Sequence, residues 1–330
     1  MAFGYIGKEP TNDITENNGV FSLEDLNELE EDAKLNSKSF EADFLVVAGG
    51  GGGGVGASGN FGGGGGAGGI ISSVDNQGGG NTLDSAKTLA KGVAYSVEVG
   101  AGSNANGYLG GHSNFDTLTA VGGGRGWRSN RAIGGGSAGG GGRAFNWLAY
   151  ARSVPRAMSD SAATLAFGSV SNQGSDGNNT GYESYNSAGG GGGASGNRGT
   201  RVEGSNGIIV NIASTTNAGS ANVGETSGSN VYYGGGGAGG HYSHTGGGLG
   251  GGGNGHDYYS NSGDANTGGG GGGNLGTGSA GGSGVVIIRY PDTLTCTASA
   301  GVTGVEKTEA NNKKTFIVTA GSGTLTWSDA

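Results

Sequence analysis

Runs of glycine recur along this chain and constrain its fold more than any other feature. They lie at 49–54, 62–69, 122–126, 134–142, 189–193, 234–240, 246–253, 268–273 and 281–284. Because glycine loses more conformational entropy on ordering than other residues, a single run of this kind usually forms a flexible linker. A chain that repeats the run many times presents two alternatives: a long disordered tether, or a fold built from glycine backbone.

The composition excludes several classes of protein. There are 84 glycines but only 3 prolines and no Gly-X-Y period, which excludes collagen. With 13% charged and 32% hydrophobic residues, the chain lacks the high charge typical of disordered proteins. Its net charge of -9 argues against a nucleic-acid partner, and its single cysteine, Cys296, has no partner for an internal disulfide.

The sequence gives no sign of a membrane span or a secretory signal. No stretch of about 18 consecutive apolar residues occurs, so no transmembrane helix is expected. The N-terminal letters MAFGYIGKEP lack the basic and apolar regions of a signal peptide. A protein assembled into a particle inside a cytoplasm reaches the outside without such a signal.

Two apolar segments bracket the glycine-rich region. They read ADFLVVA at 42–48 and GVVIIRYP at 284–291, and both are rich in β-branched residues. Such short apolar runs predict buried strands. We expect the two strands to pair antiparallel and to close the region between them, which a linker would not require.

Repeated glycine runs can themselves form a packed structure. Without Cβ atoms, extended chains approach closely and donate their backbone N–H groups to carbonyls on neighbouring runs. We therefore predict a mostly irregular and β fold, a bundle of polyglycine-II helices clasped by short β-strands. A short N-terminal helix at 21–35, carrying Leu23, Leu26 and Leu29, and a small C-terminal β unit complete it.

This organisation predicts three parts of the chain. Residues 1–42 form an N-terminal attachment segment with the short amphipathic helix, and 43–290 form the glycine-rich domain with exposed loops. Residues 291–330 form the small C-terminal β unit, since TLTCTAS, KKTFIVTA and TLTW show the Thr and Val alternation of strands.

The motifs resemble a known family. The opening ADFLVVAGGGGGG, the repeated GGGGAGG-like runs and the closing GSGVVIIRYP resemble the glycine-rich domain of bacteriophage tail-fibre and adhesin proteins, including tip adhesins of T-even-like phages. The segments MAFGYIG and GVFSLEDLNELEEDAKL resemble N-terminal regions of structural proteins from marine and cyanobacterial phages. The resemblance covers about residues 1–290 and leaves 292–330 unmatched.

In that family, the resemblance implies a virion protein of the tail fibre, made in the host cytoplasm, whose loops recognise a glycan or an outer-membrane component of the host. The N-terminal segment then joins other tail proteins. The resemblance leaves the assembly state open between a homotrimer and a single chain.

Counting run directions predicts which loops face the host. If successive runs alternate in direction, the segments 55–61, 127–133, 197–233 and 254–267 lie at the end away from the strands. Aromatic and arginine side chains are typical anchors of recognition surfaces. The receptor-binding candidates are therefore Phe61, Trp127, Arg128, Arg131, Tyr232, Tyr233, His256, Tyr258 and Tyr259.

Catalysis and cofactors are not expected. No paired carboxylates or nucleophile triad stands out, so we predict a protein that is not an enzyme. The histidines of HYSH, His241 and His244, are three residues apart, but no cysteine or expected helix supports a metal site there. Six arginines lie between Asp116 and Asp160 without an acidic residue, which suits either an anionic glycan or ordinary solvated loops.

Two other functions compete with receptor binding. A polyglycine-II ice-binding protein requires a flat, regular face of small residues, whereas these loops are irregular and aromatic. An extracellular structural glycine-rich protein would show monotonous repeats without bracketing strands. The sequence favours the receptor-binding protein over both.

Overall fold

The computed structural model describes residues 39–56, 60–106, 108–126, 135–141, 173–177, 187–195 and 202–330. The expected N-terminal helix at 21–35 lies outside these residues. Strands dominate the described part, in which α2 (Thr215–Ala221) is the one α-helix. The strands and the short 3-10 helix η1 are β1 (Ser39–Val47), β2 (Ile70–Ser72), η1 (Gly78–Gly80), β3 (Lys87–Ala90), β4 (Ala94–Glu98), β5 (Ser113–Phe115), β6 (Leu118–Ala120), β7 (Ile208–Ile209), β8 (Glu225–Ser227), β9 (Asn230–Tyr233), β10 (Val285–Pro291), β11 (Leu294–Ala298), β12 (Val302–Glu309) and β13 (Lys313–Asp329).

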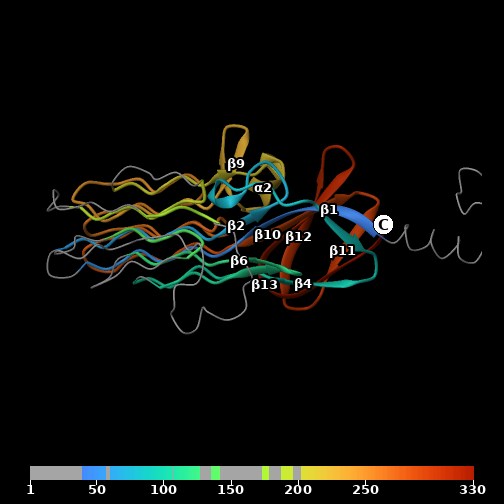
Figure 1. Ribbon diagram of the computed structural model, residues 1–330, viewed down its shortest axis with the longest axis horizontal. Coiled ribbons are helices and arrows are strands. Elements are labelled where there is room, and N and C mark those ends of the chain that lie inside the picture. The colour runs from blue at the N-terminus through green and yellow to red at the C-terminus, as the bar shows by residue number, and fades with distance from the viewer. Residues whose placement is uncertain are drawn as a thin grey trace, which may run out of the picture.

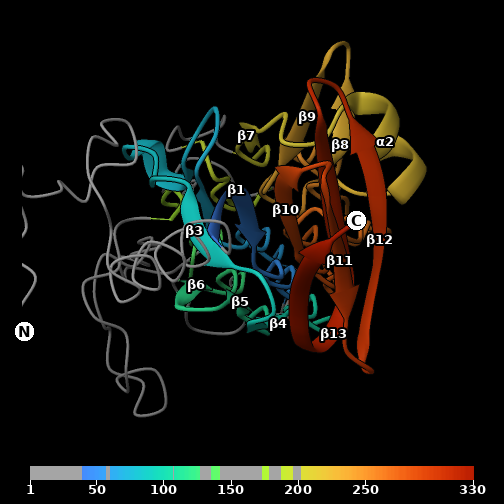
Figure 2. The same ribbon diagram turned by 90° about the vertical axis from the view of Figure 1, so that its right-hand side faces the viewer.

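Ten strands form one antiparallel sheet that curls into a nearly closed barrel (Figures 1 and 2). The order along it is β2-β1-β10-β13-β4-β5-β6, with β3 on β1 and both β11 and β12 on β13. The predicted pairing of the two bracketing segments is confirmed, since β1 pairs antiparallel with β10 from Asp43–Arg289 to Val47–Val285. The last strand, β13, continues the sheet from β10 and connects it to β4.

A buried glutamine bridges the two ends of this sheet, β2 and β6. The side-chain oxygen of Gln173 accepts from the Val121 amide at 2.8 Å, and its side-chain nitrogen donates to the Thr119 carbonyl at 3.0 Å. Its own carbonyl accepts from the Ile70 amide at 3.3 Å. Gln173 therefore supplies hydrogen bonds between β2 and β6, the two ends of the sheet, where no strand lies between them in the described residues.

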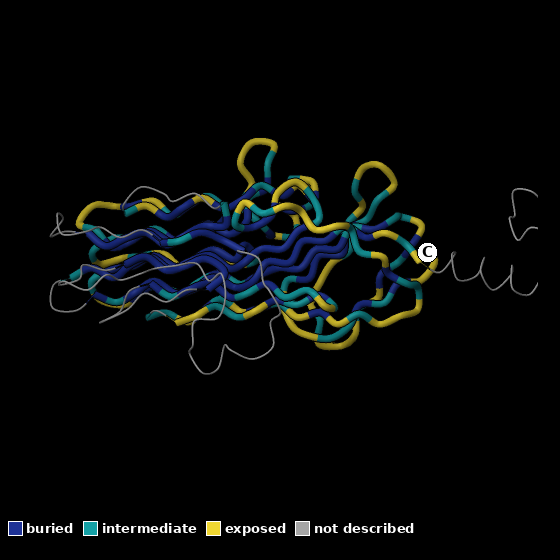
Figure 3. The backbone as a smooth tube through the Cα atoms, viewed as in Figure 1, coloured by how far each residue is buried: buried dark blue, intermediate teal, exposed yellow. Residues whose placement is uncertain are grey.

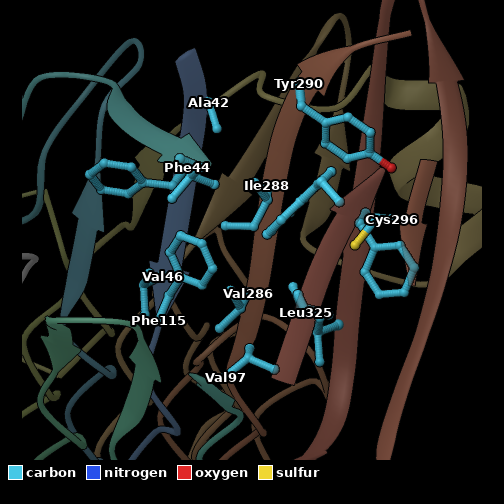
Figure 4. Close-up of a cluster of buried hydrophobic side chains, with 14 of the residues drawn as sticks. Ala42, Phe44, Val46, Val97, Phe115, Val286, Ile288, Tyr290, Cys296 and Leu325 are labelled. Carbon is cyan, nitrogen blue, oxygen red and sulfur yellow. The ribbon is translucent and has the colours of Figure 1, made fainter. Parts of the chain in front are cut away.

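Alternate residues of the central strands serve two different cores. Phe44 and Val46 of β1 point into the barrel with Ile288 and Tyr290 of β10 (Figure 4). The intervening residues of the same strands, such as Leu45, face a second layer. Because both faces of β1 and β10 are buried at 44–47 and 285–288, these parts of the strands are continuously apolar instead of alternating.

The second layer is a three-stranded sheet, β7-β9-β8, with α2 beside it. Val210, Ile212 and Tyr233 from this layer pack on Leu45 and Ile287. The Arg289 guanidinium, ion-paired with Asp43 at 2.8 Å, also donates to the Ile212 carbonyl at 3.4 Å. This contact ties the second layer to the β1–β10 pair.

Trp327 is the centre of the barrel's aromatic packing. Its ring is buried, and its centroid lies 5.7 Å from those of Phe40 and Tyr290 and 6.0 Å from that of Tyr95. Aromatic pairs at such spacings in tilted or edge-on geometry are favourable beyond their burial.

The glycine runs extend side by side from the barrel toward the opposite end of the molecule (Figure 1), and their interior is buried (Figure 3). Successive amides of one run donate to different neighbours. Gly65 donates to Gly271 at 2.8 Å, Gly66 to Gly124 at 2.7 Å, and Ala67 to Gly192 at 3.0 Å. A strand within a sheet has only two lateral neighbours, whereas this run is hydrogen-bonded on several sides.

The predicted fold class, a bundle of polyglycine-II helices with a small C-terminal β unit, is wrong. The described molecule is mostly β, its organising element is the barrel-like sheet, and no glycine run between the bracketing strands is identified as a polyglycine-II helix. The reason lies in the apolar segments. The strands from 285 to 329 share one sheet with β1, because both faces of β10 and of β13 around Ile317 have apolar surface to bury.

Candidate functional site

Two loops, 241–245 and 254–262, lie together at the distal end, which is the end of the glycine runs away from the barrel. The Thr245 amide donates to the Gly255 carbonyl at 3.1 Å, and the Gly255 amide donates back at 3.0 Å. The buried Thr245 hydroxyl donates to the Gly239 carbonyl at 2.8 Å. These three bonds fix both loops to the run 234–240.

One aromatic pair anchors the first loop. The Tyr242 ring packs edge-on against Phe61, with 4.9 Å between centroids. Phe61 is 1% exposed, and Tyr242 is 55% exposed. Phe61, a predicted receptor contact, is therefore an internal support for a tyrosine that does reach the surface.

The second loop presents the most exposed rings of the described surface. Tyr258 is 72% exposed and Tyr259 is 80% exposed. The Tyr258 amide donates to the Asp257 carboxylate at 2.9 Å. His256 precedes this turn, and its ring lies 5.2 Å from that of His244 in the first loop. We call Tyr242, His244, His256, Tyr258 and Tyr259 the distal patch.

A serine and asparagine network holds the second loop from beneath. The Ser260 and Ser279 hydroxyls are 2.7 Å apart, and the Ser279 hydroxyl also donates to the Ser260 carbonyl at 2.8 Å. The side-chain nitrogen of Asn274 donates to the Ser260 hydroxyl at 3.1 Å. The backbone carrying Tyr258 and Tyr259 is thus attached to the final glycine runs.

The other predicted contact residues do not join the distal patch. Tyr232 and Tyr233 belong to β9, beside the barrel, where Tyr233 is fully buried in the second core. Burial raises the pKa of the Tyr233 phenol, with a smaller contribution from the negative charge of Glu309. Trp127, Arg128 and Arg131 lie outside the described residues.

The assumed alternation of runs failed for two physical reasons. Residues 207–233 are apolar enough to pack on the outer face of the barrel and do not continue to the distal end. The stretch 246–253 is a hairpin, since Gly250 and Gly251 have φ of +100° and +85° and the Gly252 amide donates back to the Gly248 carbonyl at 3.0 Å. Consequently 241–245 lies at the same end as 254–262.

Sequence reasoning missed Tyr242 and His244. The HYSH motif drew attention as a histidine pair, but the run count placed it at the wrong end. The signal that could have corrected it is the central Leu249 in GGGLGGGG, which interrupts this glycine run at the point of reversal.

Within the described residues, no group of three or more His, Cys, Asp and Glu side chains is arranged to hold a metal ion. No helix in that part of the chain has the length and apolar character needed to cross a membrane.

The barrel, the laterally bonded runs and the loop-borne patch define a glycine-rich scaffold that holds a few side chains at its far end. The chain belongs to the glycine-rich domain family, whose model matches residues 32–291. This match ends with β10, although β11–β13 beyond it share the same sheet. No curated protein matches the chain, and neither does any solved structure.

Proposed function

We propose that this chain is a non-enzymatic receptor-binding protein of a bacteriophage tail fibre, carried on the virion and made in the host cytoplasm. Its partner is a glycan or an outer-membrane component of the host surface. The distal patch makes the contact and requires no cofactor or nucleic acid.

The observation that carries this proposal is the exposure of Tyr258 and Tyr259 on a loop with a fixed backbone. Tyrosine is enriched at the centres of binding interfaces, because its ring provides a large contact area and its hydroxyl provides a polar partner. A loop already ordered by the Ser260 and Asn274 network loses little further entropy when it binds.

The orientation of the chain supports the same reading. The described residues begin with β1, in the barrel, and β13 also ends there (Figure 1). In the proposal, the N-terminal segment joins other tail proteins at the barrel end, and the distal patch then faces away from the virion. The assembly is either a homotrimer or a single chain.

The experiment is adsorption of the purified, fluorescently labelled protein to a panel of bacterial cells that includes cyanobacteria, together with binding to a glycan array. Replacing Tyr258 and Tyr259 by alanine should reduce binding at least about tenfold, since interface tyrosines commonly contribute more than about 1–2 kcal/mol. Tyr108→Ala is the matched control, because Tyr108 is 54% exposed but lies outside the distal loops. Equal binding by the double variant and the control would refute the assignment.

A further inference from the structure

Two histidines from separate loops meet at the distal end. His244 and His256 are twelve residues apart in sequence, but the reciprocal Thr245–Gly255 amide bonds bring their loops together. Their ring centroids are 5.2 Å apart and the ring planes are tilted by 53°. His244 is exposed and His256 is partly exposed, so solvent reaches the pair.

The neighbouring carboxylate determines which nitrogen of His256 is free. The Nδ1 atom of His256 contacts the Asp257 carboxylate, which also accepts from the Tyr258 amide at 2.9 Å. That amide lies farther from Nδ1, at 3.4 Å, so the carboxylate is the closer partner of Nδ1, whereas the Nδ1 atom of His241 has no such carboxylate beside it among the described residues. An ionised carboxylate only accepts hydrogen bonds, so Nδ1 carries the proton in this contact. The Nε2 atom of the neutral ring therefore keeps its lone pair. A carboxylate bound to the far nitrogen is the usual arrangement for a metal-binding histidine.

The spacing of the rings suits a shared metal ion. A zinc–nitrogen bond is about 2.0–2.1 Å, so two imidazoles on one tetrahedral zinc have ring centres about 5 Å apart. The observed 5.2 Å agrees with this value. By contrast, His241 of the HYSH motif uses its Nδ1 to accept from the Ser243 amide at 2.9 Å, so its proton lies on Nε2 and no lone pair remains for a metal.

We propose that His244 and His256 together bind one divalent transition-metal ion of the Zn²⁺ class. Asp257 orients His256 and offsets part of the ion's charge. The described residues supply no third ligand of the usual kinds, so water or a donor from a bound molecule fills the other coordination positions. The ion links loop 241–245 to loop 254–262. This site stands independently of the receptor function proposed above.

The test is isothermal titration of the full-length, untagged protein with ZnCl₂, with MgCl₂ as the hard-cation control, because Mg²⁺ prefers oxygen ligands. We expect one Zn²⁺ per chain and no Mg²⁺ heat. His244→Gln and His256→Gln should each abolish or weaken binding at least tenfold, whereas His241→Gln should bind as the wild type does. Asp257→Asn should weaken binding by about 10–100-fold.

A second measurement separates ligation from loss of fold. Far-UV circular dichroism of each variant without metal should match the wild type, and Zn²⁺ should raise the wild-type unfolding midpoint but not that of His256→Gln. The proposal is overturned if Zn²⁺ does not bind, if only one of the two glutamine variants weakens it, or if His241→Gln weakens it equally.

Discussion

Replacing Gly65 by alanine adds one methyl group where the run 62–69 meets three others. A Cβ atom built on Gly65 lies 2.1 Å from the Gly51 carbonyl oxygen and 2.7 Å from its carbon. Non-bonded heavy atoms need about 3.5 Å. Both partners are backbone, so no side chain can turn away, and the runs must separate by about 1.4 Å.

This separation disturbs the lateral bonds that Gly65 makes. Its amide donates to Gly271 at 2.8 Å, and its carbonyl accepts from Gly237 at 2.9 Å. Two hydrogen bonds at about 0.5–1.5 kcal/mol each, with an overpacking cost of about 1–3 kcal/mol, give an expected loss of about 2–6 kcal/mol in the free energy of unfolding.

The assay is urea denaturation followed by far-UV circular dichroism, with hydrogen exchange of peptides covering 49–69. Gly276→Ala is the matched control, since a Cβ there has no atom within 4 Å and the backbone φ is not positive. The control should stay within about 0.5 kcal/mol of the wild type. Equal unfolding midpoints and equal exchange for the two variants would refute the argument that backbone contact between runs holds the scaffold together.

Three further outcomes are expected at the barrel. Gln173→Leu should lower the unfolding free energy by about 2–4 kcal/mol in urea denaturation, because the Val121 amide and the Thr119 carbonyl lose the buried side chain that bonds them. An unchanged unfolding free energy would contradict the role of Gln173 in joining β2 and β6. Burial raises the pKa of Glu306, but hydrogen bonds from Tyr290, the Cys296 amide and Lys314 outweigh it and the net pKa is lowered. A lowered folded pKa stabilises the protein above the ordinary glutamate pKa of about 4.3 and loses that effect as the pH falls through the folded value, so the stability difference between wild type and Glu306→Gln should shrink below about pH 4. Burial, and less so the Glu306 charge, raise the pKa of the Cys296 thiol, so at pH 8 it should react with a disulfide reagent only after denaturation.

Apolar segments were the most predictable part of this chain. The letters ADFLVVA and VVIIRYP fall on β1 and β10 and pair as expected, because β-branched runs flanked by glycine have few other ways to bury their surface. The sequence does not indicate that the C-terminal strands β11–β13 join the same sheet as β1 and β10. That outcome depends on Trp327 and Leu325 reaching the barrel interior, a contact between distant parts of the chain.

Placement of the site was less predictable. Tyr258, Tyr259 and His256 were selected as members of one distal loop, where the structure has them. Phe61 and Tyr233 were selected by ring type alone, and ring type does not distinguish an anchor inside the scaffold from one on its surface. Loop position depended on run direction, and a single reversal at Gly250 and Gly251 changed it.

The glycine runs are held together by hydrogen bonds between main-chain atoms. The packing of the runs therefore depends little on the side chains in the loops that connect them. Exchanges at Tyr258 and Tyr259 alter the presented chemistry while the carbonyls and amides of the neighbouring runs keep their partners. Such an architecture separates the part of the gene that must be conserved from the part that is free to diversify. It also makes the loop a natural position for randomised libraries in which specificity is selected anew on an unaltered frame.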